Sequence, residues 1–408
     1  MKNSIFAYSK KNKMNIILFD GPNRDNLLPL TFTKPVADLR IGILTIKEKW
    51  EHLLKTEVSF LTQDYLRKKF PIKSEKLNYL INGSVIPNKN IISEIKKLET
   101  GQLLLKNNEP IAALLKDFRV ETIDFEDLND FDLIQTQSDF KQVKFPWDIF
   151  SLNGEEIETD FKLLTKGRKS KKLSDTVQTN QAENIFLEKG AKVEFATLVP
   201  ENGYMYIGKN AEIMPGSVVK GSLAMGEHSV LKLSAKIYGP TTIGPHSKVG
   251  GEVNNCVIQG YSNKGHDGFL GNSVIGEWCN LGADTNNSNL KNNYAEVKLW
   301  NYNKKSFVKS GLQFCGLIMG DHSKCGINTM FNTGTVVGVS ANIFGDGFPR
   351  NFIPSFSWGG ASGFTTYKLP KVFETANLVM QRRNIELDET EQAILEDIFK
   401  QTEEFRTK

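Results

Sequence analysis

The sequence lacks the features of a secreted, membrane-spanning or disulfide-bonded protein. Only four of its 408 residues are cysteines, and none of them forms a Cys-x-x-Cys pair. No run approaches the roughly 18 apolar residues that a membrane span needs, and the N-terminus has no apolar signal core. We therefore expect a cytoplasmic protein with reduced thiols and no membrane partner.

Net charge is almost absent as well. The 51 Lys and Arg residues nearly balance the 47 Asp and Glu residues, and the net charge of +4 gives no reason to expect a nucleic-acid partner. The basic run at residues 166–172 is interpreted as a solvated linker. A hydrophobic fraction of 39% and a length of 408 residues are typical of a soluble protein with two domains.

What the sequence does contain is a hydrophobic period of six residues in its second half. Such a period is too short for a helical repeat. It suits a chain that winds round a triangular prism with three short parallel strands per turn, in which the apolar positions fill the interior. The uninterrupted positions are Ile207, Ile213, Val219, Met225, Leu231, Ile237, Ile243 and Val249.

Two interruptions, near residues 250–256 and at about residues 283–318, divide the period into three registers. Breaks in a stacked repeat are where loops leave the prism, and loops carry function more often than rungs do. The first register also contains Leu187, Val193 and Val199. The second is predicted to contain Val257, Asn263, Phe269, Ile275 and Leu281, and the third Met319, Cys325, Phe331, Val337 and Ile343.

The first part of the chain alternates strand-like apolar runs with helical patterns, which favours an α/β sheet with parallel strands. Strands are predicted at residues 15–19, 77–81 and 103–105, and helices at about 42–56, 91–100 and from 145 onward. We expect a disordered extension at 1–13, the α/β domain at 14–160, a linker at 161–185, the prism at 186–370 and a terminal helix at 371–408.

A loop with one arginine and one lysine follows the first predicted strand. In an open α/β sheet this loop lies at the carboxyl edge, where nucleotides usually bind. Arg24 and Lys34, ten residues apart, could reach a triphosphate from either end of the loop. The alternative is structural, since Pro-Leu-Thr at 29–31 and Lys-Pro at 34–35 could simply form turns.

A histidine near the first interruption of the prism is a candidate catalytic base. Transfer of an acetyl group to an amine needs a base for the ammonium proton, a donor for the thioester oxyanion and a groove for the acyl carrier. His266 has Lys264 and Asp267 as neighbours and a sequel rich in Asn and Thr. Four of the five histidines share its offset of three from an inward position, so each is also interpreted as a solvated corner residue.

The loop at residues 20–35 resembles the signature of the sugar nucleotidyltransferases. By this resemblance Arg24, Lys34 and Asn82 would bind the nucleotide and sugar phosphate, and the first domain would have a Rossmann-like nucleotidyltransferase fold. The family's metal-binding Gly-Asp is replaced here by Gly83-Ser84. Nucleotidyl transfer needs a divalent cation such as Mg²⁺, so the metal ligands remain unknown and this activity is in doubt.

The prism resembles the acetyltransferase half of the bifunctional enzymes of UDP-N-acetylglucosamine synthesis. The resemblance lies in Lys264-Gly265-His266, in residues 280–285 (Asn-Leu-Gly-Ala-Asp-Thr) and in Asn289. It implies a left-handed parallel β-helix of hexapeptide repeats, with His266 as general base and Lys264, Asn280 and Asn289 on the amino sugar. It also implies acetyl-CoA as co-substrate, with Arg350 near a coenzyme phosphate, and a homotrimer.

The expected function is therefore acetyl transfer to glucosamine 1-phosphate, followed by uridylyl transfer from UTP. One alternative is a single-activity acetyltransferase whose nucleotide domain has degenerated. The other is a non-catalytic trimeric scaffold that binds sugar nucleotides. The sequence leaves open whether the segment at residues 286–312 is a lid over the groove or a trimer contact.

Overall fold

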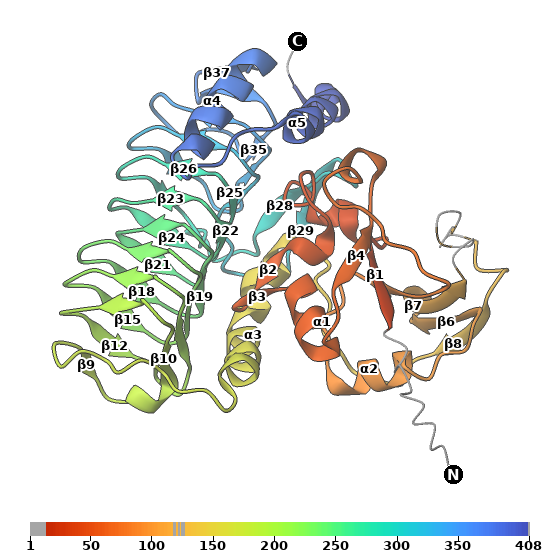
Figure 1. The fold of residues 1–408 in the computed structure, drawn as a ribbon. Coiled ribbons are helices and arrows are strands. Elements are labelled where there is room, and N and C mark those ends of the chain that lie inside the picture. Colours follow the sequence, from red (N-terminus) through yellow and green to blue (C-terminus); the bar gives the residue numbers. More distant parts are fainter. Residues whose placement is uncertain (1–13, 117–119, 121–122, 124–126, 407–408) are drawn as a thin grey trace.

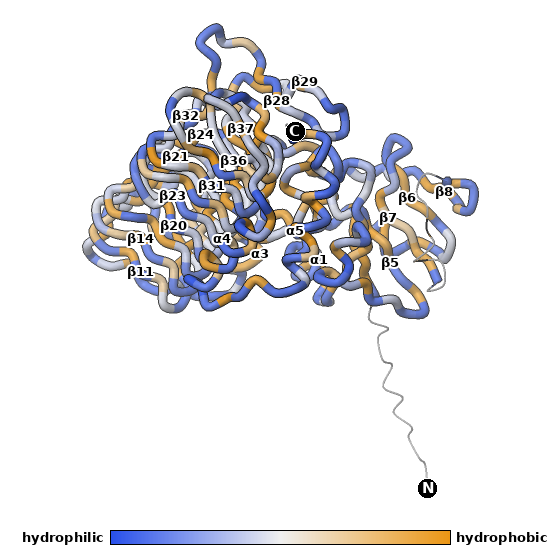
Figure 2. The backbone as a smooth tube through the Cα atoms, turned by 90° about the horizontal axis from the view of Figure 1, so that it is seen from above, coloured by the Kyte–Doolittle hydropathy of each residue, from blue (hydrophilic) through white to orange (hydrophobic). Residues whose placement is uncertain are grey.

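The computed structural model describes residues 14–116, 120, 123 and 127–406, so the predicted extension at 1–13 lies outside the described residues. An α/β domain lies beside a tall prism of stacked short strands, and two helices cover the top of the prism (Figure 1). Seen from above, the prism and the sheet of the α/β domain lie next to each other (Figure 2). Within the described residues, no helix is both long and apolar enough to cross a bilayer.

The α/β domain contains a six-stranded mixed sheet in the order β4-β1-β5-β7-β6-β8. The predicted strands are present, and β4, β1 and β5 are parallel. The expectation of a parallel sheet fails at β7, which runs antiparallel to β5 and β6. Asn107 and Asn108, both at positive φ, join β6 to β7 in a tight hairpin that reverses the chain. The strands are β1 (Asn15–Phe19), β4 (Val58–Leu61), β5 (Leu77–Asn82), β6 (Gln102–Lys106), β7 (Glu109–Lys116) and β8 (Asp132–Gln135).

Three helices flank this sheet: α1 (Ile46–Leu54), α2 (Lys89–Ile95) and α3 (Pro146–Thr165). The helix predicted at 42–56 starts later, because Gly42 has a φ of +77° and turns a small hairpin of β2 (Arg40–Ile41) and β3 (Leu44–Thr45). A capping box between Thr45 and Glu48 then begins α1. Helix α3 continues to Thr165, so the linker predicted from 161 is wrong in its first residues.

The prism has three faces of parallel strands, and its left-handed β-helix fold agrees with the prediction. The third face begins with β9 (Gln178–Thr179), so the prism starts before residue 186. The first face contains β10 (Ile185–Leu187), β13 (Met205–Ile207), β16 (Leu223–Met225), β19 (Thr241–Ile243), β22 (Val257–Gly260), β25 (Val274–Glu277), β30 (Ile318–Met319), β33 (Val336–Val337) and β35 (Phe352–Ile353).

The second face contains β11 (Lys192–Val193), β14 (Glu212–Ile213), β17 (Val230–Leu231), β20 (Lys248–Val249), β23 (Asn263–Lys264), β26 (Asn280–Leu281), β31 (Lys324–Cys325), β34 (Asn342–Ile343) and β36 (Ser357–Gly360), with antiparallel β37 (Gly363–Thr366) at its end. The third face continues with β12 (Thr197–Val199), β15 (Val218–Lys220), β18 (Lys236–Tyr238), β21 (Glu252–Asn254) and β24 (Phe269–Gly271). The pair β27 (Asn286–Asn287) and β32 (Met330–Phe331) lies above β24.

The corner between the first and second faces is built from residues in the left-handed conformation, which the sharp turn requires. On five successive turns the residue at this corner carries a ring, and each ring stacks on the next. The centroids are 5.0, 5.0, 4.3 and 6.4 Å apart along the series. We call this series the ring column; it contains His228, His246, Tyr261, Trp278 and His322.

The predicted second register is shifted by one residue at its start. Ile258, Lys264 and Leu270 occupy the inward positions, in place of Val257, Asn263 and Phe269. The shift arises because the step from Leu270 to Ile275 is five residues rather than six, so a strict period that runs back from Ile275 misses Leu270 and the positions before it. The predicted first and third registers are confirmed from Ile207 on, and Leu187 and Val193 are also buried in the prism core. Val199 was predicted wrongly, because Leu198 takes the inward position and pairs with Val219.

The C-terminal segment contains two helices where one was predicted. Asn384, at a φ of +57°, lies in the turn between α4 (Leu369–Gln381) and α5 (Glu389–Gln401), and Asp388 caps α5. Helix α4 runs back along the prism until Arg383, just after it, donates to the carbonyl of His246. Lys69 of the α/β domain pairs with Glu391 of α5. The C-terminal helices thereby join both domains.

The α/β domain is fastened along the first face of the prism. At the lower end Phe161 of α3 packs against Phe186 and Tyr204. Farther up, the Thr242 hydroxyl donates to the carbonyl of Gly42 at 2.9 Å, and residues of both domains share one buried core. A hairpin that leaves the prism, β28 (Lys298–Asn301) and β29 (Ser306–Lys309), reaches the same interface.

Candidate functional site

The loop at residues 20–35 is buried between the two domains. Leu27, Leu30 and Phe32 belong to the shared core. The ring of Phe32 packs edge-on against Tyr302, which lies in the segment at residues 286–312 that leaves the prism, with the ring centroids 5.2 Å apart. We call this segment the excursion. Asn301 donates to Asn26 across the same contact at 3.1 Å. The loop that was predicted to reach phosphates from both of its ends therefore packs against the prism.

Arg24 is held by its own domain. Its Nη2 donates to the carbonyl of Thr31 and to the Tyr65 hydroxyl, both at 2.8 Å. Its guanidinium also pairs with Asp25 at 2.9 Å and lies 3.5 Å from Asp20. The side chain is only 8% exposed, so in this structure its charge is directed at the loop itself.

Lys34 points away from Arg24 and into the prism. Its Nζ lies 2.7 Å from Glu277 and 3.2 Å from Asp321, and Asp321 also accepts from the Thr33 hydroxyl. Burial alone would lower the pKa of Lys34, but Asp321 and Glu277 outweigh burial and raise it above its ordinary value. Two carboxylates of the prism thus occupy the anion position at this lysine.

Asn82 is fully buried and uses its side chain within the domain. Its Nδ2 donates to the carbonyl of Pro110, and its Oδ1 accepts from the backbone and hydroxyl of Ser84. At the same sheet edge Glu109 accepts from Asn23, Gln142 and Lys144. Sequence reasoning missed this cluster, because its members come from distant segments that only the fold brings together.

The carboxyl edge does not offer a fitting site for Mg²⁺. Hard divalent cations prefer several carboxylate and carbonyl oxygens, whereas Glu109 is the single carboxylate of the cluster just described and is paired with Lys144 at 2.6 Å. Across the described part of the chain, no three His, Cys, Asp or Glu side chains gather in a way that could hold a metal ion. We therefore derive no step through a metal.

His266 lies on the exposed corner between the second and third faces, just after β23. Its side chain makes no hydrogen bond to any residue that the structure describes, so the imidazole is free to meet a ligand. His228, His246 and His322 belong instead to the ring column at a different corner. The predicted common offset is wrong, because Asn263 does not point inward.

Lys264 lies inside the prism rather than on a sugar-binding surface, which corrects its predicted role. It occupies an inward position and is 2% exposed. Its Nζ donates to the carbonyls of Gly250 and His266, both at 3.0 Å. Burial lowers the pKa of Lys264 to about 8. Its position indicates that Lys264 holds the corner on which His266 is carried.

Replacing Lys264 by methionine is expected to stabilise the prism at pH 7 by about 1–2 kcal/mol. Burying the ammonium costs about 3 kcal/mol when the pKa falls from 10.5 to about 8, and the two lost hydrogen bonds offset part of that gain. Between these pH values the unfolded chain holds more protons, so stability rises with pH. This rise should become shallower but persist, because burial also lowers the pKa of Lys324 to about 8.

Urea unfolding at pH 7 and pH 9.5 measures both effects. The control is Lys236→Met, at an exposed lysine on the third face. This change should alter neither the free energy of unfolding at pH 7 nor its rise between pH 7 and pH 9.5. A Lys264→Met variant less stable than wild type at pH 7 would contradict this prediction, because it would show that the buried ammonium makes a net favourable contribution to the free energy of unfolding.

Asn280 and Asn289 are not gathered round His266 within one chain. Asn280 lies on β26 of the second face, in register with Asn263. Asn289 follows β27, at the edge where the chain leaves the prism, and donates to Asn272 at 2.8 Å. The three predicted residues therefore lie on different parts of the prism surface, and the chain alone does not unite them.

A groove near the top of the prism combines positive charge with aromatic rings. Its volume is about 720 Å³. The predicted coenzyme residue Arg350 lies in its wall, just before β35, and Lys291 and Lys298 supply two more cations. Trp300 stacks on Phe352 at 4.3 Å. The other aromatic residues that line the groove are Phe307 and Phe405.

The excursion at residues 286–312 forms part of the wall of this groove. Trp300 and Phe307, on β28 and β29, form part of the groove wall. On the other side of the hairpin, Tyr302 packs against Phe32 of the α/β domain and Phe405 of the C-terminal segment. The excursion is thus a wall that joins three parts of the chain.

Comparison with known proteins gives relatives for both halves. A family model described as sugar nucleotidyl transferase matches residues 16–169. A bifunctional sugar-1-phosphate nucleotidylyltransferase/acetyltransferase of Sulfurisphaera tokodaii is 27% identical over 271 residues, 65% of this chain and 57% of that protein. The bifunctional protein GlmU of Methanococcus aeolicus is 26% identical over 277 residues, 65% of this chain and 56% of that protein.

Among solved structures, a UDP-N-acetylglucosamine acyltransferase from Campylobacter jejuni covers 58% of this chain and 92% of its own, with 12% identity and a TM-score of 0.25. This likeness is too slight to add to the strand pairing described above. The chain spans little more than half the length of the curated relatives that it matches. Residues 16–169 therefore match the sugar nucleotidyl transferase family model, and the chain is similar to bifunctional sugar-1-phosphate nucleotidylyltransferase/acetyltransferases.

Proposed function

We propose that this chain is an acyltransferase that moves an acetyl group from acetyl-CoA to the amine of a hexosamine phosphate such as glucosamine 1-phosphate. The groove at Arg350 is the observation that carries the proposal. Its three cations suit the phosphates of the coenzyme, and its rings suit the adenine base. The acetyltransferase names of the relatives support the same reaction.

In the proposed reaction, His266 removes a proton from the acceptor ammonium. The freed amine attacks the thioester carbonyl; a C–N bond forms and the C–S bond breaks. The second proton, which the nitrogen loses on forming the amide, goes to the leaving thiolate, and His266 releases the first proton to water. A base needs access to both substrates, and the exposed corner of His266 supplies it. Asn280 and Asn289 would orient the acceptor only if residues from another copy complete the site.

We propose a homotrimer for this reason. Large apolar side chains stand exposed at the corner that carries His266 or beside it: Phe195 at 65%, Leu233 at 64%, Ile327 at 69% and Phe344 at 41% exposure. A second copy that covers them would bring its own surface next to His266. Exposed apolar groups aligned in this way are typical of subunit interfaces.

Uridylyl transfer to the acetylated product is the second candidate, because the family model covers the first domain. The geometry favours the single-activity alternative, in which this domain is a brace for the prism. Arg24, Lys34 and Asn82 are each engaged within the chain, and Lys34 is paired with the prism. A purely non-catalytic scaffold is the least favoured alternative, since it gives the exposed His266 no role.

A coupled assay separates these possibilities. Glucosamine 1-phosphate, acetyl-CoA, UTP and Mg²⁺ are supplied together, and free CoA and pyrophosphate are followed separately. Release of CoA alone is the expected result. Pyrophosphate as well would establish the bifunctional reaction, and the absence of both products would contradict the proposed acyl transfer.

Replacing Arg350 by alanine is expected to raise KM for acetyl-CoA about tenfold with little change in kcat, because a charge-assisted contact to a phosphate is lost. The control is Arg382→Ala, an exposed arginine in the turn after α4. Acetyl-CoA that lacks its 3′-phosphate shows which phosphate is involved: if Arg350 binds that group, the variant and wild type should differ little with this donor. If wild type and Arg350→Ala have equal KM values for intact acetyl-CoA, Arg350 does not bind the coenzyme.

A further inference from the structure

A second, polar cavity lies between the two domains, away from the groove and from His266. Its volume is about 150 Å³. The β2–β3 hairpin and the start of α1 form one wall, and β22 and β25 of the prism form the other. The lining residues are Asp38, Arg40, Thr45, Lys47, Glu48, Gln259 and Glu277.

The walls of this cavity are held in place by contacts that cross the domain boundary. Gln259 accepts from the backbone N–H of Arg40 at 2.6 Å and donates to its carbonyl at 3.1 Å. Glu277 pairs with Lys34, and Glu48 is fixed by the capping box of α1. The cavity is therefore a feature of the docked domains, and interfaces between domains are common places for ligand sites.

Charged groups of both signs face this space with unused bonding capacity. The Asp38 carboxylate makes neither a hydrogen bond nor an ion pair with the described residues, and burial raises the pKa of Asp38 to about 6. The Arg40 guanidinium also lines the cavity, and its Nη1 forms a long pair with Glu48 at 3.4 Å. The Lys47 ammonium forms a loose pair with Glu51 at 3.9 Å and lies 5.7 Å from the centroid of the Phe60 ring, so it has no close anionic partner among the described residues.

The sign pattern decides which ligand fits. A simple anion would meet Asp38, Glu48 and Glu277, and a simple cation would meet Arg40 and Lys47. Either would place like charges together in a partly buried space, which is costly. Glu277 is already paired with Lys34, and Glu48 with Arg40. A molecule that carries an ammonium group and a phosphate offers the ammonium to Asp38 and the phosphate to Lys47 and Arg40.

We propose that the interdomain cavity binds a small molecule with one ammonium group and one phosphate, Asp38 receiving the ammonium and Arg40 and Lys47 the phosphate. The acceptor of the proposed acyl transfer belongs to this class, and to that extent the inference rests on the proposed function. The cavity would hold this molecule at the domain boundary, apart from the reacting corner at His266.

Isothermal titration of the full chain, without acetyl-CoA, tests the cavity. The probes are glucosamine 1-phosphate, N-acetylglucosamine 1-phosphate, in which the amine is neutral, and glucose 1-phosphate, which has no amine. We expect the first probe to bind at least about tenfold more tightly than the other two, since only it carries both charges. Failure of all three to bind, or equal affinity for all three, would overturn the proposal.

Variants locate the binding. Asp38→Asn keeps the volume and should remove the preference for the amine, whereas Lys47→Met should weaken all three probes. Lys68→Met, at an exposed lysine outside the cavity, is the control. Loss of binding in His266→Ala but not in Asp38→Asn would overturn the cavity site while leaving acyl transfer intact. Binding that depends on Asp38 in a protein that releases no CoA would uphold the cavity and reject the proposed acyl transfer.

Discussion

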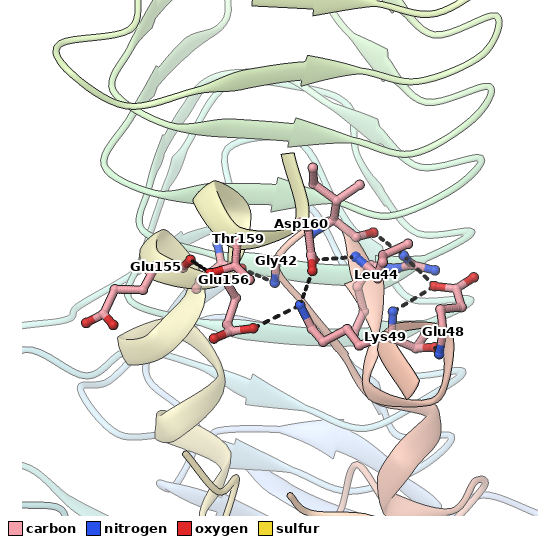
Figure 3. Close-up of polar contacts among 12 residues, drawn as sticks. Gly42, Leu44, Glu48, Lys49, Glu155, Glu156, Thr159 and Asp160 are labelled. Atoms are coloured by element: carbon pink, nitrogen blue, oxygen red, sulfur yellow. Dashed lines mark hydrogen bonds and ion pairs between the residues drawn. The ribbon is translucent and has the colours of Figure 1, made fainter. Parts of the chain in front are cut away.

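Replacing Lys49 by methionine is expected to lower the free energy of unfolding by about 3–5 kcal/mol. Lys49 of α1 lies between Glu156 and Asp160 of α3, and the three side chains are at most 3% exposed (Figure 3). Asp160 also accepts from the backbone N–H groups of Ile43 and Leu44. Removal of the ammonium would leave two buried carboxylates without a counter-charge, which costs far more than the loss of an exposed pair.

The loss should depend on pH in a defined direction. Burial raises the pKa of Asp160 to about 6 even with Lys49 present, so the folded state holds its proton at a higher pH than the unfolded state does. This group therefore gains stability as the pH falls through 6 toward 4. Without Lys49 the carboxyl group should protonate still more readily, so the deficit of the variant should shrink between pH 7 and pH 5.

Urea unfolding of the variant at these two pH values measures the effect. Lys47→Met on the same helix is the matched control, because its pair with Glu51 is long and partly exposed; we expect a change below about 0.5 kcal/mol. Adding Asp160→Asn to Lys49→Met should recover part of the loss. If the single Lys49→Met variant proves as stable as wild type, the buried ion pairs of Lys49 with Glu156 and Asp160 make no net contribution to the free energy of unfolding, and the prediction is wrong.

Exchange of His266 for asparagine is expected to reduce kcat for acyl transfer by about 10²–10⁴-fold, the usual contribution of a general base. The fold should be unaffected, because the side chain is exposed and makes no contact that holds the corner. KM for acetyl-CoA should stay near its wild-type value.

His228 provides the matched control for this exchange. It is also an exposed corner histidine, and its φ of +56° is one that asparagine tolerates well. We expect His228→Asn to retain activity. Equal losses in the two variants would show that histidines on the prism act through structure, and full activity in His266→Asn would assign the base to another residue.

The repeat was predictable because hydrophobic positions in a stacked prism have nothing to pack against except one another. The prediction held from Ile207 to Val249 and again from Met319 to Ile343. Between them it was off by one residue at Ile258 and Lys264, because several steps there, such as that from Leu270 to Ile275, are shorter than six residues. A hydrophobicity pattern cannot find an inward lysine, since the backbone acceptors that satisfy its ammonium appear only in the fold.

The sites were harder to predict than the fold, for a physical reason. Arg24 and Lys34 have the spacing of phosphate ligands, but their partners are set by tertiary contacts. Glu277 and Asp321, which pair with Lys34, lie more than two hundred residues away in the sequence. His266 differed from the other histidines only by its neighbours in sequence; the ring column that separates them is formed by successive turns of the prism.

A stack of short strands would ordinarily fray, since each turn touches only the turns beside it and can open without them. Here helix α3 and the loop at residues 20–35 lie along much of one face, from Phe186 near the bottom to Asp321 in the upper part. Several turns of the prism are thus packed against the same rigid domain. Opening one turn would also break its contacts with that domain, so we expect the prism to unfold in one cooperative step. The first domain would then stabilise the prism against local unfolding even in a protein that binds no nucleotide.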